Sequence, residues 1–249
     1  MRALVIVALA GCGRLGFDPG APADAALDDG ADAGTDANPL DVICGSSDSD
    51  GDGIGDACDP SGAVAHEVAL YEPFDTLPPW TTTGAGIWTV TAGGLHGMYT
   101  DLSASSFVAP GSFDPPLTVI VRYTIDELDS NGTTNFTISA VDAFDLPTED
   151  SQKCGQASPS RLAIGYEMAG TTVDASNVAF PDSLKAGATY VTTFDHSAAT
   201  MTCTTEVPAL GPTATVSVQH APWRSSGNVG VRIRSIAATF HWLLVITPK

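Results

Sequence analysis

The chain has 249 residues and a formal net charge of −19 at pH 7, with 29 Asp and Glu against 10 Lys and Arg. Because contacts to phosphates need a Lys- and Arg-rich surface, this balance argues against a nucleic-acid partner and against electrostatic adhesion to anionic lipid. With 43% hydrophobic and 16% charged residues most of the chain is able to fold, and 25 Gly and 17 Pro disfavour a helical protein. No apolar run reaches the roughly 18 residues of a membrane-spanning helix.

The first residues have the parts of an export signal. Arg2 precedes an apolar stretch, Ala3 to Ala10, which small residues follow, as in secretory signals. The run Leu9-Ala10-Gly11-Cys12 resembles the lipobox of bacterial lipoproteins. The resemblance implies cleavage before Cys12, acylation of that residue, and attachment to a membrane through the lipid. A plain signal peptide with a chance cysteine is the alternative.

A spacer follows the expected lipid anchor. From Asp18 to Pro39 the chain consists mostly of Ala, Asp, Gly and Pro, so it has little to bury, and its like charges favour an extended segment. We therefore expect residues 1–11 to be the signal and residues 12–43 to be the lipidated tether. Gly13, and not Asp, follows the cysteine. The resemblance to lipoproteins then implies an exported protein anchored in the outer membrane of a Gram-negative bacterium.

Carboxylates recur at every second position in the next segment. From Asp48 to Asp59 the chain reads Asp-Ser-Asp-Gly-Asp-Gly-Ile-Gly-Asp-Ala-Cys-Asp. Calcium takes about six to eight oxygen ligands, and a twelve-residue loop supplies them from positions 1, 3, 5, 9 and 12 and from the backbone carbonyl of position 7, with Gly at position 6 for the turn. The sequence therefore predicts a calcium site formed by Asp48, Asp50, Asp52, Asp56, Asp59 and the carbonyl of Ile54, with Gly53 at the turn.

Residues 44–60 resemble one thrombospondin type 3 repeat, whose units run Asp-x-Asp-x-Asp-Gly-x-Gly-Asp-x-Cys-Asp. That family stacks many copies and this chain has one, so the expected affinity for calcium is weak, with a dissociation constant of about 10⁻⁴–10⁻³ M. No helix-forming sequence is expected to flank the loop, so a helix–loop–helix hand is not predicted. The alternative is a solvated acidic linker without metal.

Four cysteines remain once Cys12 is assigned to the lipid, and four cysteines allow three pairings. We expect Cys44 to pair with Cys58, which closes a ring of about 15 residues around the acidic loop. Cys154 is then expected to pair with Cys203, because the thiols of exported bacterial proteins tend to be oxidised. A zinc site built from all four thiolates is the rival interpretation, but no two of them have the short spacing that such sites use.

Residues 64–249 alternate apolar and polar side chains with a period of two. The clearest runs are 119–125, 136–140 and 229–233, and further strand-like runs lie at 87–90, 161–166, 189–194, 200–204, 214–218 and 239–247. Turn-forming clusters of Gly, Asn, Ser and Pro separate them. About ten short strands predict an all-β fold, an antiparallel β-sandwich. Residues 145–160 lack the alternation and are expected to form a long excursion.

Two passages resemble the concanavalin A-like jelly roll of the laminin-G and lectin/glucanase superfamily. The first runs from Glu72-Pro73-Phe74-Asp75 through Trp80 to Gly93-Gly94-Leu95, and the second runs from Gly227 to Val245. The resemblance implies that the first and last strands are neighbours. It also implies a domain, residues 64–249, that binds a carbohydrate or a protein partner.

Catalytic motifs are weak. Some members of that superfamily are glycosidases with a Glu-x-Asp-x-x-Glu strand, and the nearest match here is Asp126-Glu127-Leu128-Asp129, which lacks the terminal Glu and is expected to be a turn. None of the five histidines has a second histidine at a helical spacing, so each is expected to be a surface or packing residue.

Four tryptophans are candidates for stacking against sugar rings. Trp88 and Trp242 lie in expected strands and are predicted to pack there, whereas Trp80 and Trp223 lie beside Pro in expected loops and are the candidate ligand-binding residues. The predicted function is therefore a non-catalytic surface lipoprotein for adhesion or recognition. A structural envelope protein without a small ligand and, less favoured, a carbohydrate-active hydrolase are the alternatives.

Overall fold

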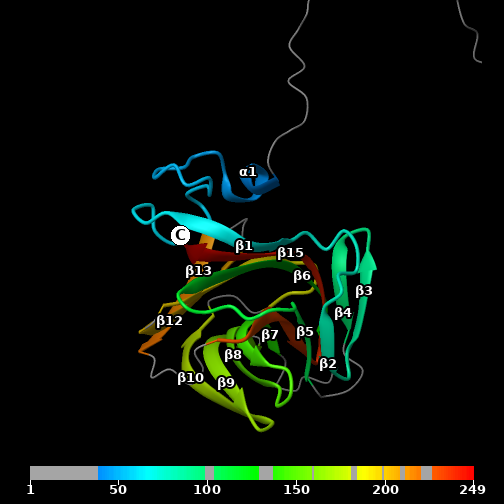
Figure 1. The fold of residues 1–249 in the computed structure, drawn as a ribbon. Helices are drawn as coiled ribbons and strands as arrows, with labels where there is room; N and C mark the ends of the chain where they lie inside the picture. The colour runs from blue at the N-terminus through cyan, green and yellow to red at the C-terminus, as the bar shows by residue number, and fades with distance from the viewer. Residues whose placement is uncertain are drawn as a thin grey trace, which may run out of the picture. The chain divides into compact units, whose positions relative to one another are not determined.

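The computed structural model describes residues 39–98, 104–128, 137–158, 160–180, 184–197, 199–207, 211–219 and 226–249. They belong to one compact unit, Asn38–Lys249, while Met1–Ala37 is a separate unit outside the described residues. The described part contains one helix and fifteen strands, and the strands form two antiparallel sheets that pack face to face (Figure 1). No helix in that part is long and apolar enough to cross a membrane.

The two sheets contain eight and seven strands. The eight-stranded sheet has the order β13-β12-β11-β6-β15-β4-β3 with β1 also paired to β15, and the seven-stranded sheet has the order β10-β9-β8-β7-β14-β5-β2. The helix is α1 (Pro39–Cys44), and the strands are β1 (His66–Glu72), β2 (Thr81–Gly84), β3 (Ile87–Thr91), β4 (Gly94–Met98), β5 (Ala104–Val108), β6 (Leu117–Leu128), β7 (Thr137–Asp145), β8 (Asp150–Ser158), β9 (Arg161–Met168), β10 (Thr171–Ala179), β11 (Thr189–His196), β12 (Thr200–Val207), β13 (Gly211–Gln219), β14 (Asn228–Arg234) and β15 (Ile236–Pro248).

The period-two alternation places one face of each sheet in the core, as predicted. On β6, Val119, Val121 and Tyr123 lie in the main core between the sheets, whereas Ile120 lies in a separate cluster on the outer face. Successive strand residues point to opposite faces, so the apolar set of each strand is buried against the other sheet. The predicted antiparallel jelly-roll sandwich is confirmed.

The first and last strands are neighbours, as the resemblance implied. β1 pairs antiparallel with β15, with a register from His66 opposite Pro248 to Glu72 opposite Leu243. β15 pairs on its other side with β6, from Ile236 opposite Leu128 to Ile246 opposite Thr118. The last strand therefore lies inside its sheet, between β6 on one side and β1 and β4 on the other.

The predicted excursion at residues 145–160 is wrong. Most of this segment is β8, a strand inside the seven-stranded sheet that pairs with β7 and β9. Its inward residues include Gln152 and Gln156, which are fully buried, so the apolar alternation that marks a strand is missing. Gln156 is held by the hydroxyl of Tyr123, which donates to Gln156 Oε1 at 3.3 Å. The alternation of apolar and polar residues also did not predict five further strands, namely β1, β2, β4, β5 and β10.

Both expected disulfides are present in the structure. Cys44 is bonded to Cys58, and Cys154 is bonded to Cys203. Cys154 lies on β8 and Cys203 on β12, and both are fully buried in the main core. The second disulfide therefore joins the two sheets through the middle of the sandwich.

Candidate functional sites

The acidic loop, residues 48–59, is attached to the outer face of the eight-stranded sheet. Ile54 is 2% exposed and lies in an apolar cluster with Cys44 and Cys58 from the loop region. The sheet contributes the outward residues of β6 and β15 to the same cluster, namely Ile120, Trp242, Leu244 and Ile246. Burial of an Ile side chain contributes about 1.5–3 kcal/mol, so Ile54 holds the loop against the sheet.

One short helix precedes the loop, contrary to the expectation that no helix flanks it. α1 spans Pro39–Cys44 and begins with proline, whose fixed φ suits the first turn of a helix. Cys44, its last residue, is bonded to Cys58, so the helix end and the loop end are covalently joined. No second helix follows the loop within the described residues, and the predicted absence of a full helix–loop–helix hand agrees with this arrangement.

Three of the predicted calcium ligands converge. One carboxylate oxygen each from Asp48, Asp50 and Asp52 lie within 4.8 Å of one another. Backbone amides of the loop donate to one of these carboxylates: those of Gly51 and Gly53 donate to Asp48 at 2.7 and 2.9 Å. Gly53 has a φ of +94°, the region in which a residue without Cβ is favoured, as predicted for the turn.

The donor set of these three residues fits a hard cation. Asp50 Oδ2 is buried and has no hydrogen-bond partner among the described residues. Burial raises the pKa of Asp50, and the nearby carboxylates of Asp52, Asp59 and Asp48 raise it further. A divalent cation would satisfy the unpartnered oxygen and remove the repulsion.

Asp56 lies outside this group. Ser47 Oγ donates to Asp56 at 2.6 Å, and both the backbone amide and the hydroxyl of Ser49 donate to it at 2.8 and 2.9 Å. The hydrogen bond from the Ser47 hydroxyl, followed by those from Ser49, lowers the pKa of Asp56. Its role as a metal ligand stays a prediction, and in the structure its oxygens accept hydrogen bonds from the residues at the start of the loop.

Asp59 forms a second group with Asp52 and His66. His66 Nδ1 lies 2.8 Å from Asp59 Oδ1, and the His66 backbone amide donates to Asp52 Oδ2 at 2.5 Å. Sequence reasoning missed His66, which is 6% exposed, although it stands only seven positions after Asp59. Lys249 Nζ donates to the backbone carbonyl of Asp52 at 2.9 Å. The loop is therefore tied to the first strand and to the C-terminal residue.

Asp52 belongs to both groups of side chains, the one with Asp48 and Asp50 and the one with Asp59 and His66. Burial would raise its pKa, but the amides of His66 and Ile54 and the charges of Lys249 and His66 together lower it. Its side chain therefore holds the loop to β1 as well as facing Asp48 and Asp50. A substitution that removes the Asp52 carboxylate would disturb the loop itself, and not its metal affinity alone.

Of the tryptophans that the structure describes, Trp80 and Trp88 pack in the main core between the sheets, and Trp242 packs beneath the acidic loop on the outer face of the eight-stranded sheet. Trp80 lies 5.5 Å from Phe74 and 5.4 Å from Phe107, measured between ring centroids, and is only partly exposed. Trp88 and Trp242 are 8% and 9% exposed, in agreement with their predicted packing role. Trp223 and Cys12 lie outside the described residues.

The weak glycosidase candidate lies at the end of β6. Asp126 Oδ2 accepts a hydrogen bond from Thr239 at 2.7 Å and lies 3.0 Å from His96 Nδ1. Asp126, Glu127 and Leu128 remain in the strand, and residue 129 is outside the described part. The expectation of a turn is therefore wrong for residues 126–128, and the contacts of Asp126 join β6 to β4 and β15.

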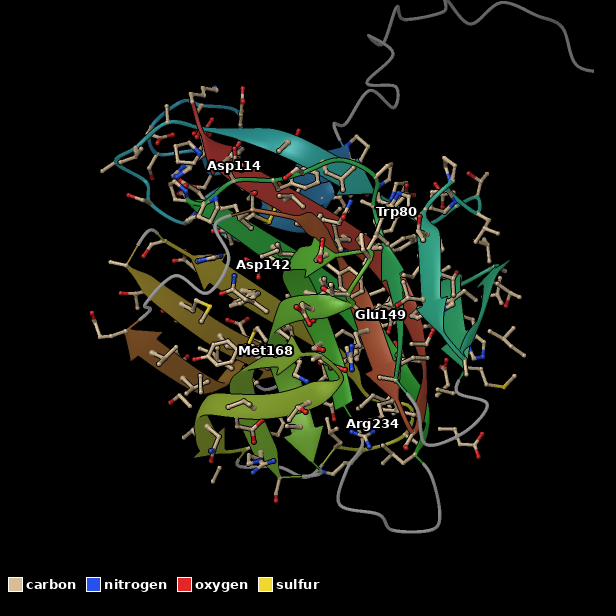
Figure 2. All side chains as sticks on the ribbon, turned by 60° about the horizontal axis from the view of Figure 1, so that its bottom comes forward. Trp80, Asp114, Asp142, Glu149, Met168 and Arg234 are labelled. Atoms are coloured by element: carbon tan, nitrogen blue, oxygen red, sulfur yellow. A yellow bond between two sulfur atoms is a disulfide. The ribbon has the colours of Figure 1, made fainter. Side chains whose placement is uncertain are left out.

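The outer face of the seven-stranded sheet carries a groove of about 280 Å³. Its floor consists of small residues at the outward positions of the central strands, namely Ser139 on β7, Gly155 and Ala157 on β8, and Ala163 and Gly165 on β9. Larger side chains surround them, namely Lys153, Arg161, Thr172, Asp174, Arg232 and Arg234. Figure 2 turns this face forward, with Met168 of β9 and Arg234 of β14 labelled. The hollow exists because the floor residues have little or no side chain.

Sequence reasoning did not single out the groove residues. Arg232 and Arg234 were visible as the polar half of a strand pattern, and Arg161 as the first residue of another. Lys153 lies in the segment expected to be an excursion. The sequence does contain one indication of the groove, because basic residues are rare in this chain and these four stand at outward strand positions. That they lie on one face depends on the order of the strands in the sheet.

No protein-family model and no curated protein sequence matches the chain. Among solved structures, the carbohydrate-binding module CBM66 from Bacillus subtilis is similar, with 14% identity and a TM-score of 0.53 over 65% of this chain and 91% of that module. A protein of unknown function with a galectin-like fold from Bacillus subtilis has 12% identity and a TM-score of 0.54 over 73% and 97%. The Lotus tetragonolobus seed lectin has 10% identity and a TM-score of 0.54 over 72% and 98%. The fold formed by strands β1 to β15 is thus a lectin-like jelly-roll β-sandwich.

Proposed function

We propose that this chain is a non-catalytic, exported lipoprotein whose jelly-roll domain binds carbohydrate and whose acidic loop binds calcium. The observation that carries the carbohydrate proposal is the groove on the outer face of the seven-stranded sheet. It is open, its floor is made of small residues, and hydrogen-bonding groups from Lys153, Arg161 and Thr172 stand around it. A concave site with a few convergent polar groups is the usual form of a ligand site.

The similar structures support this proposal at the level of the fold. One of them is a carbohydrate-binding module and another is a seed lectin. The same fold hosts different functions, so the groove residues have to carry the argument for this chain.

Binding of glycans by the purified full chain tests the function. We expect saturable binding to at least one class of glycan on an array, confirmed by isothermal titration, and loss of affinity when Gly155 is replaced by Leu to fill the groove. Gly187→Leu is unsuitable as a control because Gly187 has a φ of +80°. A better control is Thr202→Leu, which places the same Leu side chain at a partly exposed position on the outer face of the other sheet. Uniformly negative arrays would contradict the carbohydrate proposal.

The acidic loop and the groove lie on opposite sheets, and this separation makes a further prediction. The loop packs on outward residues of β6 and β15, whereas the groove is built on β7, β8, β9, β10 and β14 (Figure 1). Calcium in the loop would therefore not bridge to a sugar in the groove. We expect a chelator to lower the melting temperature of the protein but to leave its glycan affinity unchanged, as measured by thermal unfolding and titration with and without EDTA.

The lipid anchor is proposed from the sequence alone. Replacing Cys12 by Ser should prevent acylation and move the protein from the detergent phase to the aqueous phase in Triton X-114 partitioning. Anchoring needs two or more acyl chains, because one chain gives only marginal binding. Mass spectrometry of the mature N-terminus provides an independent measurement, and an unmodified Cys12 in the wild-type protein would contradict the proposal.

A further inference from the structure

We propose that the groove binds an acidic saccharide, a sugar chain that carries carboxylate or sulfate groups. This inference rests on the proposed function and specifies its ligand. The claim concerns the residues Lys153, Arg161, Arg232 and Arg234, which lie on β8, β9 and β14 and line one hollow. The whole chain has only 10 Lys and Arg and a net charge of −19, so this concentration of basic residues is unusual for the molecule.

The ion pairs between described residues neutralise only part of the positive charge of Lys153, Arg161 and Arg232. Glu167 forms ion pairs with both Lys153, at 3.5 Å, and Arg232. Asp174 Oδ2 lies 3.1 Å from Arg161. Among the described residues, three basic side chains, Lys153, Arg161 and Arg232, thus share two carboxylates. The surplus favours an anion, since opposite charges attract more strongly where water is partly excluded.

Several donors in the groove have no hydrogen-bond partner in the part of the chain that the structure describes. Arg232 is only 4% exposed, and its Nε has no hydrogen-bond partner among the described residues. The same holds for Arg161 Nε and for the hydroxyl of Ser139 on the groove floor. Unsatisfied buried donors cost free energy, and an arginine fork is suited to bind a carboxylate or sulfate through two parallel hydrogen bonds. A ligand with anionic oxygens would therefore complete the hydrogen bonding of the groove.

The chemistry of the lining also favours a saccharide with charge over a neutral one. None of the described residues that line the groove is aromatic, so ring stacking is not what the groove offers. Thr172 and Ser139 provide hydroxyl groups near the cations, which suits a ligand that has hydroxyls and an anionic group side by side. At about 280 Å³ the hollow is near the lower end of the range for ligand sites, about 300–1,000 Å³, so we expect it to hold part of a sugar chain.

Lys153 makes the binding dependent on pH. Burial, and then the charge of Arg232, lowers the pKa of Lys153 to about 8, while Glu167 and Asp174 oppose the shift. The Lys153 ammonium also donates to Thr172 Oγ1 at 3.1 Å, and Arg161 and Arg234 are the other charged residues of the lining. Affinity for an anion should therefore fall as the pH rises through about 8, because Lys153 loses its charge there while the arginines keep theirs.

Titration of the purified full chain with matched probes tests the inference. The probes are oligogalacturonate, its fully methyl-esterified form, a sulfated oligosaccharide, neutral gluco- and galacto-oligosaccharides, and poly-glutamate, all in EDTA so that calcium cannot bridge to the carboxylates. We expect a carboxylated or sulfated saccharide to bind, with at least roughly tenfold weaker binding of a neutral counterpart, and the two acidic probes tell which group is preferred. Equal binding of neutral sugars, or equally tight binding of poly-glutamate, would overturn the inference but not the proposed function of sugar binding as such. Failure of every saccharide, acidic and neutral, would overturn both.

Substitutions locate the site. Arg161→Gln and Arg234→Gln should each weaken binding of the acidic probe at least roughly fivefold, which corresponds to about 1 kcal/mol per charge-assisted contact. Arg122→Gln makes the same change of charge at an exposed position of β6 on the other sheet and should leave the affinity unchanged. Thermal unfolding confirms that the variants are folded. An equal loss in all three variants would show a general charge effect and would overturn the assignment to the groove.

Discussion

Replacing both Cys154 and Cys203 by Ala is expected to lower the free energy of unfolding by about 4 kcal/mol. The two residues are 49 positions apart, and a cross-link that closes a loop of this length restricts the unfolded chain strongly. The disulfide also joins β8 of one sheet to β12 of the other, both partners being fully buried. Since small domains are stable by only about 5–15 kcal/mol, this loss is a large part of the total.

Urea unfolding of wild type and of the double variant measures the difference. The matched comparison is the double variant Cys44→Ala with Cys58→Ala, whose partners are only 14 positions apart and lie in the apolar cluster of the loop. That variant should lose calcium affinity while the sandwich keeps its unfolding midpoint much closer to wild type. Coincident unfolding of wild type and the Cys154/Cys203 variant would mean that this bond does not form in the native protein.

The sandwich was predictable because its strands alternate on the faces that form the core. β15 was visible as a strand at 239–247, although it is apolar on both faces. The structure gives the reason for the second apolar face. Leu243 and Val245 lie in the main core, whereas Leu244 and Ile246 are covered by the acidic loop region around Ile54. A strand that is buried on both sides indicates a cover, but the sequence pattern alone does not tell which segment provides it.

Neither β8 nor the groove could be predicted from the sequence pattern, and the reason is again that the pattern does not show which segments lie side by side. The inward side of β8 is polar because Gln156 belongs to a buried network in which the hydroxyls of Tyr123, Thr192 and Thr205 are bonded at 3.1 and 2.8 Å. Its outward side includes Lys153, one of the basic residues of the groove. Because β14 reaches β8 only through β7, the meeting of Arg232 with Lys153 follows from sheet order and not from spacing along the chain.

The acidic loop was predictable in its spacing and only partly in its contacts. Positions 1, 3 and 5 converge as the calcium pattern requires. Asp56 is instead bonded to two serines that stand before it, and Asp59 is 2.8 Å from His66. Both differences arise because local hydrogen-bond donors compete with a metal for the same carboxylates. The spacing does not show which partner a carboxylate takes.

Replacing Asp50 by Asn is expected to change stability in opposite directions with and without calcium. In the absence of calcium the variant should unfold at a higher temperature, because the like charges of Asp48 and Asp52 no longer act on a carboxylate whose Oδ2 has no hydrogen-bond partner among the described residues. Asparagine keeps the side-chain oxygen that accepts the Asp52 backbone amide at 3.2 Å, so the loop geometry is preserved. With calcium the order reverses, because one charged ligand is lost and the dissociation constant should rise roughly tenfold to a hundredfold.

Thermal unfolding at 5 mM calcium and in EDTA, together with isothermal titration, measures both signs. Wild type should gain about 1–2 kcal/mol from 5 mM calcium if its dissociation constant is about 10⁻⁴–10⁻³ M. Asp75→Asn, a change of the same charge at an exposed residue outside the loop, should shift neither value. Asp52→Ala is a poorer choice, since it also removes the bonds to His66 and Ile54 that hold the loop on the sheet. If Asp50→Asn destabilised the protein equally in both conditions, the Asp50 carboxylate would be a structural acceptor, and the calcium proposal would lose the residue that supports it best.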